Sequence, residues 1–151
     1  MLHFVSIAIA LHVQRHAILM AISWGFMIPS GVAIARTMKN SGPIWFKLHV
    51  FLQSTGYLLA LVGFGIGLHI TKDNRTHNTR HRTLGIAVTV MGAFQMLAML
   101  FRPHKDSEYR RIWNLWHWTM GRAAVICAIF NVYEGFNLLE VLISYGHNLC
   151  T

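Results

Sequence analysis

Four histidines recur at nearly even intervals along the chain. His16, His49, His81 and His117 follow one another at spacings of 33, 32 and 36 residues, and each stands near the start of a long apolar segment. A neutral imidazole offers a ring nitrogen to a transition metal, and two imidazoles on facing helices can hold a haem iron between them. The chemistry that this pattern indicates is haem binding, with histidine on both sides of each iron.

The direction of the apolar segments decides which histidines can meet. If the segments are membrane helices that run up, down, up and down, the first and third begin at one membrane face and the second and fourth at the other. We therefore predict one haem between His16 and His81 near one face, and a second between His49 and His117 near the other.

Small residues accompany these histidines at helical spacing. Gly85 follows His81 by four residues and Gly121 follows His117 by four, so each glycine lies on the same helical face as its histidine, one turn on. A flat macrocycle needs such space beside its ligands, although small residues in membrane helices also serve helix packing. On the second segment, Gly56 shares a face with His49, and three more glycines could admit the other haem: Gly63, Gly65 and Gly67.

The composition is that of a membrane protein. Hydrophobic residues make up 54% of the 151 residues and charged residues 12%, with a mean hydropathy of +0.44. Soluble domains average about 45–50% apolar and about 25% charged residues. The formal charge of +8 lies in the connections between apolar runs, which argues against a nucleic-acid-binding domain. At roughly 20 residues per crossing, there is room for four or five helices in one domain.

Charges, glycines and prolines bound the apolar segments. We expect an all-α fold, an integral membrane antiparallel four-helix bundle that binds two haems. Pro29 and Gly31 lie inside the first segment, where a membrane helix tolerates them and can kink. The spanning helices are expected at about 16–35, 44–70, 82–101 and 112–133.

The chain is expected to divide into three parts. Residues 1–15 form an N-terminal lead-in and residues 16–135 form the membrane core. Residues 136–151 form a C-terminal segment. Its apolar stretch, 136–145, is too short to cross a membrane and could be a truncated fifth helix.

The distribution of basic residues predicts the orientation. The face that holds the N-terminus carries Arg15, Lys72, Arg75, Arg80 and Arg82. The opposite face carries eight basic residues and is therefore expected to be cytoplasmic, with the N-terminus outside. A glycosylation triplet at 74–76, in the second connection, agrees with an outer location. The eight are Arg36, Lys39, Lys47, Arg102, Lys105, Arg110, Arg111 and Arg122.

Several motifs in a fixed order resemble a known family. They are His16-Ala-Ile-Leu-Met-Ala-Ile-Ser-Trp-Gly-Phe, Trp45-Phe-Lys-Leu-His49, His81-Arg-Thr-Leu-Gly85, Leu100-Phe-Arg-Pro103 and Trp113-Asn-Leu-Trp-His117-Trp-Thr-Met-Gly121. The stretch from about Arg15 to Leu139 resembles the cytochrome b561 core, closest to the eukaryotic branch that is joined to an extracellular DOMON domain.

The resemblance implies two b-type haems that pass electrons across the membrane. The family's ligand positions fall on His16 with His81 and on His49 with His117, the same pairs that the up-and-down argument gives. The usual donor is cytosolic ascorbate, and the acceptors are monodehydroascorbate, ferric chelates or a partner haem domain. The chain could thus act as an ascorbate-dependent transmembrane oxidoreductase of the plasma membrane or an endomembrane.

The chain also departs from the family pattern. Ala17 follows the first ligand where the family commonly has glycine, and Trp118 stands where it often has a second histidine. No DOMON domain is recognised, and the fifth helix is reduced to the stretch 136–145. These departures suggest a truncated or divergent member, or a subunit completed by a second membrane chain or by a second copy of itself.

An ascorbate anion and the haem propionates both need cationic partners. Lys47, two residues before His49, is the main candidate for the donor site, with Arg110 and Arg111 on the same face. Arg122 lies inside the fourth helix, where a propionate could pair with its charge or the side chain could extend to the interface. Basic residues at an inner boundary also commonly serve topology and lipid headgroups.

Other residues leave alternatives open. His69 could compete with His16 as a ligand, or donate to a propionate. Trp45, Trp113, Trp116 and Trp118 are expected to form an aromatic belt at one membrane boundary. Two further functions remain: a non-catalytic membrane subunit with structural haem, and a haem-free transporter or scaffold, which would leave the His-x-x-x-Gly spacings unexplained.

Overall fold

The computed structural model describes residues 2–73 and 79–148, and this part of the chain contains helices and connections but no strand. The elements are α1 (Leu2–Met20), the π-helix η1 (Ala21–Met27), α2 (Ile28–Thr37), α3 (Ile44–Asp73), α4 (Thr79–Leu100) and α5 (Arg110–Asn148).

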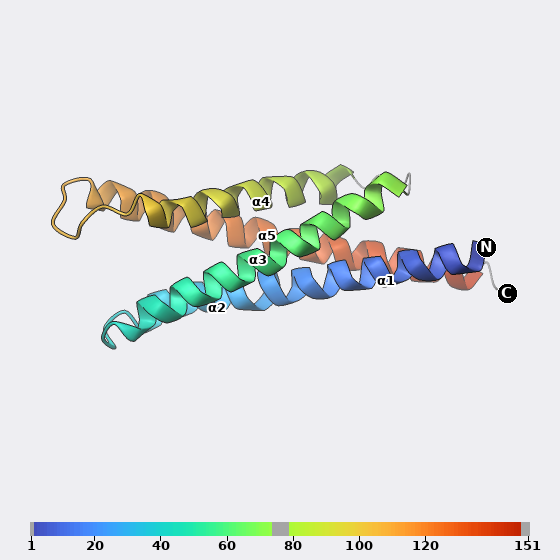
Figure 1. Cartoon of the computed structure of the whole chain (residues 1–151), viewed down its shortest axis with the longest axis horizontal. Helices are drawn as coiled ribbons and strands as arrows, with labels where there is room; N and C mark the ends of the chain where they lie inside the picture. Colours follow the sequence, from blue (N-terminus) through green and yellow to red (C-terminus); the bar gives the residue numbers. More distant parts are fainter. Residues whose placement is uncertain (1, 74–78, 149–151) are drawn as a thin grey trace.

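Four stretches of helix are long and apolar enough to cross a membrane. The first combines α1, η1 and α2, and each of the other three is a single helix; successive stretches run in opposite directions (Figure 1). The predicted all-α, multi-pass antiparallel bundle is confirmed. The four stretches are Ile7–Thr37, Ile44–Ile70, Thr79–Leu100 and Arg110–Glu140.

The ends of the chain are more helical than the sequence predicts. The lead-in belongs to α1, which begins at Leu2, and the fourth helix continues past Tyr133 to Asn148. A lone glycine such as Gly135 weakens a helix without ending it, since no proline or capping motif follows. The apolar stretch 136–145 therefore extends α5 and is not a separate fifth helix. Residues 149–151 lie outside the described part, as does the predicted glycosylation triplet.

The distortion predicted near Pro29 takes the form of the π-helix η1, directly before it. Proline has no N–H and its ring crowds the carbonyl four residues earlier, so a regular α-turn cannot continue through this point. The N–H of Ile28 instead donates to Ser23 O, five residues back. Such single-turn π-helices change the direction of the side chains that follow. Ser23 and Trp24, which belong to η1, are both buried in the bundle.

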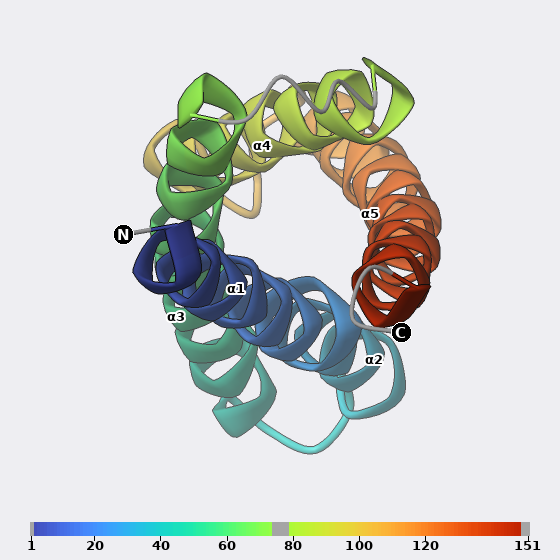
Figure 2. The same ribbon diagram turned by 90° about the vertical axis from the view of Figure 1, so that its right-hand side faces the viewer.

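The helices pack in two main contacts, α1 and α2 against α3, and α4 against α5. Viewed along its length, the bundle is a ring of helices around a central axis (Figure 2). A small cluster at its centre contains Trp24, Ile28, Ala60, Val88, Ala124 and Ala128. Large apolar side chains such as Phe51, Leu58 and Phe130 face outward, as expected for a surface in lipid.

Candidate functional site: two histidine pairs

The structure brings the four histidines together in two pairs. His16 on α1 faces His81 on α4 with ring centroids 6.0 Å apart, and His49 on α3 faces His117 on α5 with centroids 6.3 Å apart. The rings of the two pairs meet at interplanar angles of 83° and 80°. We call His16 and His81 the first pair, and His49 and His117 the second pair. Because the helices alternate in direction, the pairs lie toward opposite ends of the bundle.

The spacing within each pair fits a haem iron. A metal-bound imidazole nitrogen lies about 2 Å from the metal and the ring centroid about 1 Å behind it, so two imidazoles across one iron have centroids about 6 Å apart. Both observed separations agree with this value. No cluster of three or more metal-ligating side chains occurs among the described residues.

Three of the four rings are held by hydrogen bonds to backbone carbonyls. His16 Nδ1 donates to Gly63 O at 2.7 Å, and His49 Nδ1 donates to Gly31 O at 2.9 Å. His81 Nδ1 donates to Asn131 O at 3.1 Å. A proton on Nδ1 leaves the lone pair on Nε2, the tautomer in which histidine binds a metal through Nε2.

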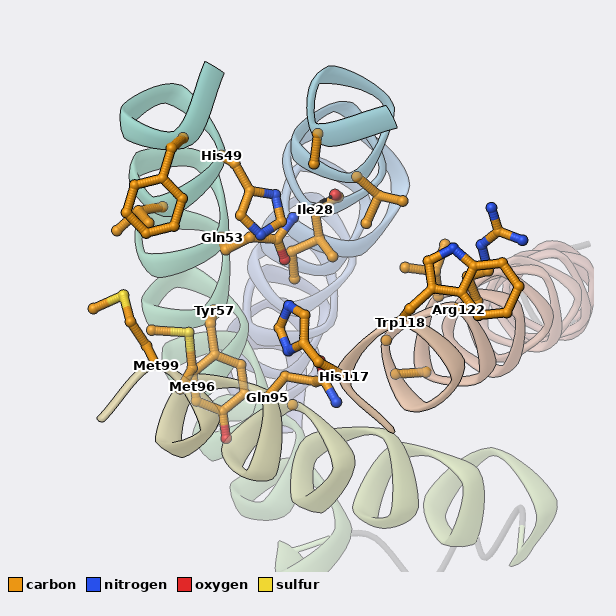
Figure 3. Close-up of a pocket in the computed structure, with 18 of the residues that line it drawn as sticks. Ile28, His49, Gln53, Tyr57, Gln95, Met96, Met99, His117, Trp118 and Arg122 are labelled. Atoms are coloured by element: carbon orange, nitrogen blue, oxygen red, sulfur yellow. Dashed lines mark hydrogen bonds between the residues drawn. The ribbon is translucent and has the colours of Figure 1, made fainter. Parts of the chain in front are cut away.

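Each pair projects into a cavity of cofactor size. The cavity at the first pair measures about 780 Å³ and that at the second about 590 Å³, and cofactor pockets usually measure about 300–1,000 Å³. Figure 3 shows both rings of the second pair directed into the space between the helices. Trp24, only 4% exposed, lines both cavities and stands between them.

Glycines shape the cavity walls, but not all of those that the sequence suggested. Gly85 lines the first cavity and Gly121 the second, as their spacing from the histidines indicates. A side chain at Gly67 would place its Cβ 2.8 Å from Cε1 of His16, and one at Gly135 would lie 3.1 Å from Cε1 of His81. By contrast, a Cβ at Gly65 would meet nothing within 4 Å.

The role of Gly135 in the wall of the first cavity was not predicted from the sequence. Gly135 packs against a histidine 54 residues earlier in the chain, so no local spacing connects the two. The available signal was its position on its own helix. It follows His117 by 18 residues, which is five turns at 3.6 residues per turn and therefore the same face.

The cavity at the second pair has a cationic rim. Of the four basic residues predicted to contact a donor or a propionate, Arg110 and Arg122 line this cavity, whereas Lys47 and Arg111 are exposed and do not. Three further contributors, Arg36, Lys39 and Arg102, were not among those four, and the signal for Arg102 was the Arg-Pro end of the third segment. The full cationic lining is Arg36, Lys39, Arg102, Arg110 and Arg122, and no acidic side chain of a described residue joins it.

Aromatic rings and carbonyls hold these guanidinium groups in place. Arg102 lies over the Phe46 ring at 4.1 Å and Arg122 over the Trp118 ring at 3.9 Å. Arg110 Nη1 donates to Pro103 O at 2.7 Å. Burial, and next the nearby Arg110 charge, lower the pKa of Arg102 from its usual range.

The tryptophans do not form the single belt that the sequence suggested. Trp116 is exposed, in keeping with a boundary position, and Trp118 is exposed along one side. Trp45 and Trp113 line the second cavity, and so does Trp118. Trp113 stacks on His117 with ring centroids 4.8 Å apart and an interplanar angle of 11°. A periodic aromatic pattern at a membrane boundary does not reveal which ring turns inward, because every ring type suits both places.

His69 lies apart from the first pair's facing rings. Its ring contacts that of His12, with centroids 5.6 Å apart, while His16 faces His81. His69 is absent from the residues that line the first cavity. The geometry thus favours His16 over His69 as the partner of His81.

A multi-pass helical membrane protein with two facing histidine pairs, each in a cofactor-sized cavity, is the class that this fold and site define. Residues 15–141 match eukaryotic cytochrome b561, and the chain belongs to that family. Membership implies haem b and supports a role in transmembrane, haem-dependent electron transfer.

Relatives from Arabidopsis thaliana carry the same core within longer chains. Two proteins named cytochrome b561 and DOMON domain-containing protein are each 41% identical, one over 143 residues (89% of this chain, 35% of the relative) and one over 134 residues (88% and 36%). A third of that name is 39% identical over 131 residues, covering 84% of this chain and 28% of its own. The chain therefore spans about a third of these relatives' length. No solved structure matches it.

Proposed function

We propose that this chain carries electrons across a membrane through two b-type haems, one held by His16 and His81 and the other by His49 and His117. The donor is a cytosolic reductant such as ascorbate at the second pair's end. The acceptor lies at the first pair's end and is monodehydroascorbate, a ferric chelate or a partner domain. The activity would be that of an ascorbate-dependent transmembrane oxidoreductase.

The observation that carries this proposal is the geometry of the histidines. Both pairs have the ring separation that a shared iron requires, and three rings donate Nδ1–H to a backbone carbonyl, leaving Nε2 for a metal. A histidine at a membrane boundary with only an interfacial role has no need to face another histidine across a cavity.

The chain's own residues supply position, charge and exclusion of lipid. Haem b, when bound, takes up and releases one electron at a time. The carbonyls of Gly63, Gly31 and Asn131 fix three imidazoles, and apolar walls keep the sites within the bundle. The cationic rim of the second cavity would attract an anionic donor and pair with propionates. Lys47 and Arg111, exposed beside this cavity, would act on the donor at longer range.

The orientation follows the predicted charge bias. Because eight basic residues lie on the face of the second pair, that face would be cytoplasmic and the N-terminus would lie outside. The membrane would be the plasma membrane or an endomembrane. The donor end and the cationic rim then lie on the same side. Lipid surrounds the apolar outer surface, and a second membrane subunit or a second copy of the chain could complete the assembly.

The alternative is a membrane subunit whose haem is structural. In that case the bundle and its haems would form without reduction by ascorbate, and the electron donor would belong to another chain.

A reduced-minus-oxidised absorption spectrum of the purified chain, with haem quantified per polypeptide and ascorbate as the reductant, tests the proposal. Two low-spin b haems that ascorbate reduces are the expected result. Two haems that ascorbate leaves oxidised would favour the structural alternative. A chain without haem after expression with ample haem supply would refute both.

A further inference from the structure

Trp113 is held against His117 by contacts from two helices. It lies four residues before His117 on α5, one turn away on the same face. The two rings are nearly parallel, at 11°, with centroids 4.8 Å apart. Across the bundle, Trp113 Nε1 donates to Ala98 O of α4 at 3.2 Å. The indole is therefore fixed at its edge by α4, while its face packs on an imidazole of its own helix, α5.

His117 differs from the other three histidines in how its ring is held. His16, His49 and His81 each donate Nδ1–H to a backbone carbonyl. His117 Nδ1 is buried and has no hydrogen-bond partner in the structure. Without a carbonyl to fix its rotation, His117 depends on packing, and Trp113 is the ring that stacks on it.

The missing hydrogen bond also has an electronic effect. A carbonyl that accepts Nδ1–H makes the imidazole a stronger electron donor at Nε2, and strong donors stabilise ferric over ferrous iron. His117, which lacks this bond, is the weakest donor of the four. The second pair is thus the one with a single carbonyl-anchored ligand, whereas both ligands of the first pair are anchored.

We propose that Trp113 is the positioning residue of His117: it orients the ring by stacking, keeps water from Nδ1, and thereby raises the redox potential of the haem at the second pair. This inference rests on the proposed function, since it assumes that the second pair holds haem. It concerns a tryptophan that the sequence places in an aromatic belt and whose position in the structure is inside the cavity.

A purely space-filling or lipid-anchoring role for Trp113 makes different predictions. Trp116, three residues further along α5, offers the matched control because it is exposed and no stack on His117 is found for it. If both tryptophans serve only as belt residues, leucine at position 113 and leucine at position 116 should have the same effect on the two haems. If Trp113 is a positioning residue, only the substitution at position 113 should change the haem properties, and the change should be confined to one of the two haems.

The test uses the full chain with haem in lipid nanodiscs and compares Trp113→Leu, Trp113→Phe and Trp116→Leu. The readouts are the two midpoint potentials by redox titration and the low-spin signals in the electron paramagnetic resonance spectrum. The signal that disappears in His117→Ala identifies the haem at the second pair. In Trp113→Leu we expect that haem's midpoint potential to fall and its signal to shift or broaden, while the other haem is unchanged.

The phenylalanine variant separates positioning from stability. It keeps an aromatic face but loses the bond to Ala98 O, so it should restore most of the wild-type potential even if the leucine variant folds poorly. Unchanged potentials and signals in Trp113→Leu would overturn the inference, as would the same change in Trp116→Leu. A wild-type chain without haem at the second pair would instead refute the proposed function, so the two failures are distinguishable.

Discussion

Replacing Gly67 with alanine should push His16 out of its position in the first pair. The new Cβ would lie 2.8 Å from Cε1 and 2.9 Å from Nδ1 of the imidazole. Carbon atoms in good contact are about 3.5–4.0 Å apart, so the ring must move by roughly 0.7 Å or more. That movement would strain or break the 2.7 Å hydrogen bond from His16 to Gly63 O.

The free-energy cost of Gly67→Ala can be estimated from these contacts. Overpacking costs about 1–3 kcal/mol, and losing the hydrogen bond costs about 0.5–1.5 kcal/mol. Alanine returns about 1 kcal/mol through its higher helix propensity. The net loss of about 0.5–3.5 kcal/mol corresponds to a decrease of about 2- to 400-fold in haem affinity at the first pair if the displaced ring bears all of it.

The assay is haem content per polypeptide, with titration of haem into the purified protein to measure the affinity of each site. Gly65→Ala is the matched control, since it lies two residues away on the same helix and its Cβ would meet nothing within 4 Å. We expect Gly65→Ala to bind haem as the wild type does, and Gly67→Ala to lose occupancy at the first pair only. Equal haem affinities in the two variants would refute the reasoning that His16 is a ligand held against Gly67.

Three further predictions follow from the site. His81→Ala should reduce the haem content from two per chain to one and spare the haem at the second pair. The control His104→Ala, at an exposed position, should keep both haems. An unchanged haem content in His81→Ala would exclude His81 as a ligand. Arg36→Gln together with Arg102→Gln should raise the KM for ascorbate and weaken its salt dependence, because both line the second cavity; Lys47→Gln should have a smaller effect, and the reverse order would move the donor site to Lys47. Gly92→Ala should lower the thermal midpoint of the loaded protein, because its Cβ would fall 2.5 Å from Cε2 of Tyr57, whose hydroxyl donates to Thr89 O; the cost is about 1–3 kcal/mol, and a midpoint equal to that of Gly65→Ala would contradict it.

The sequence was most informative about depth along the membrane. Runs of apolar residues reveal the spanning helices because the bilayer sets their length, and the distance of His16 or His49 from its segment's start sets its depth. Alternation of helix direction then restricts which histidines can meet. The pairings of His16 with His81 and of His49 with His117 need no knowledge of side-chain packing, and the structure has both.

The sequence was less informative about direction around each helix axis. Whether Trp113 turns toward lipid or toward His117 depends on how α4 and α5 pack. The residues next to Trp113 in the sequence do not indicate this packing. The same holds for Gly135 beside His81 and for Arg36 on the rim of the second cavity. The π-helix before Pro29 adds to the difficulty, because it shifts the faces that a regular 3.6-residue period would predict.

Trp24 belongs to both cavities, and this has a consequence for how the protein can change over evolutionary time. Its indole is a wall on the side of His49 and a wall on the side of His16. A smaller side chain at position 24 would enlarge both cavities at once. A rotated indole would enlarge one cavity and narrow the other. The two sites therefore cannot diverge independently, and selection acting on either should keep position 24 nearly invariant while the outward-facing residues around it drift.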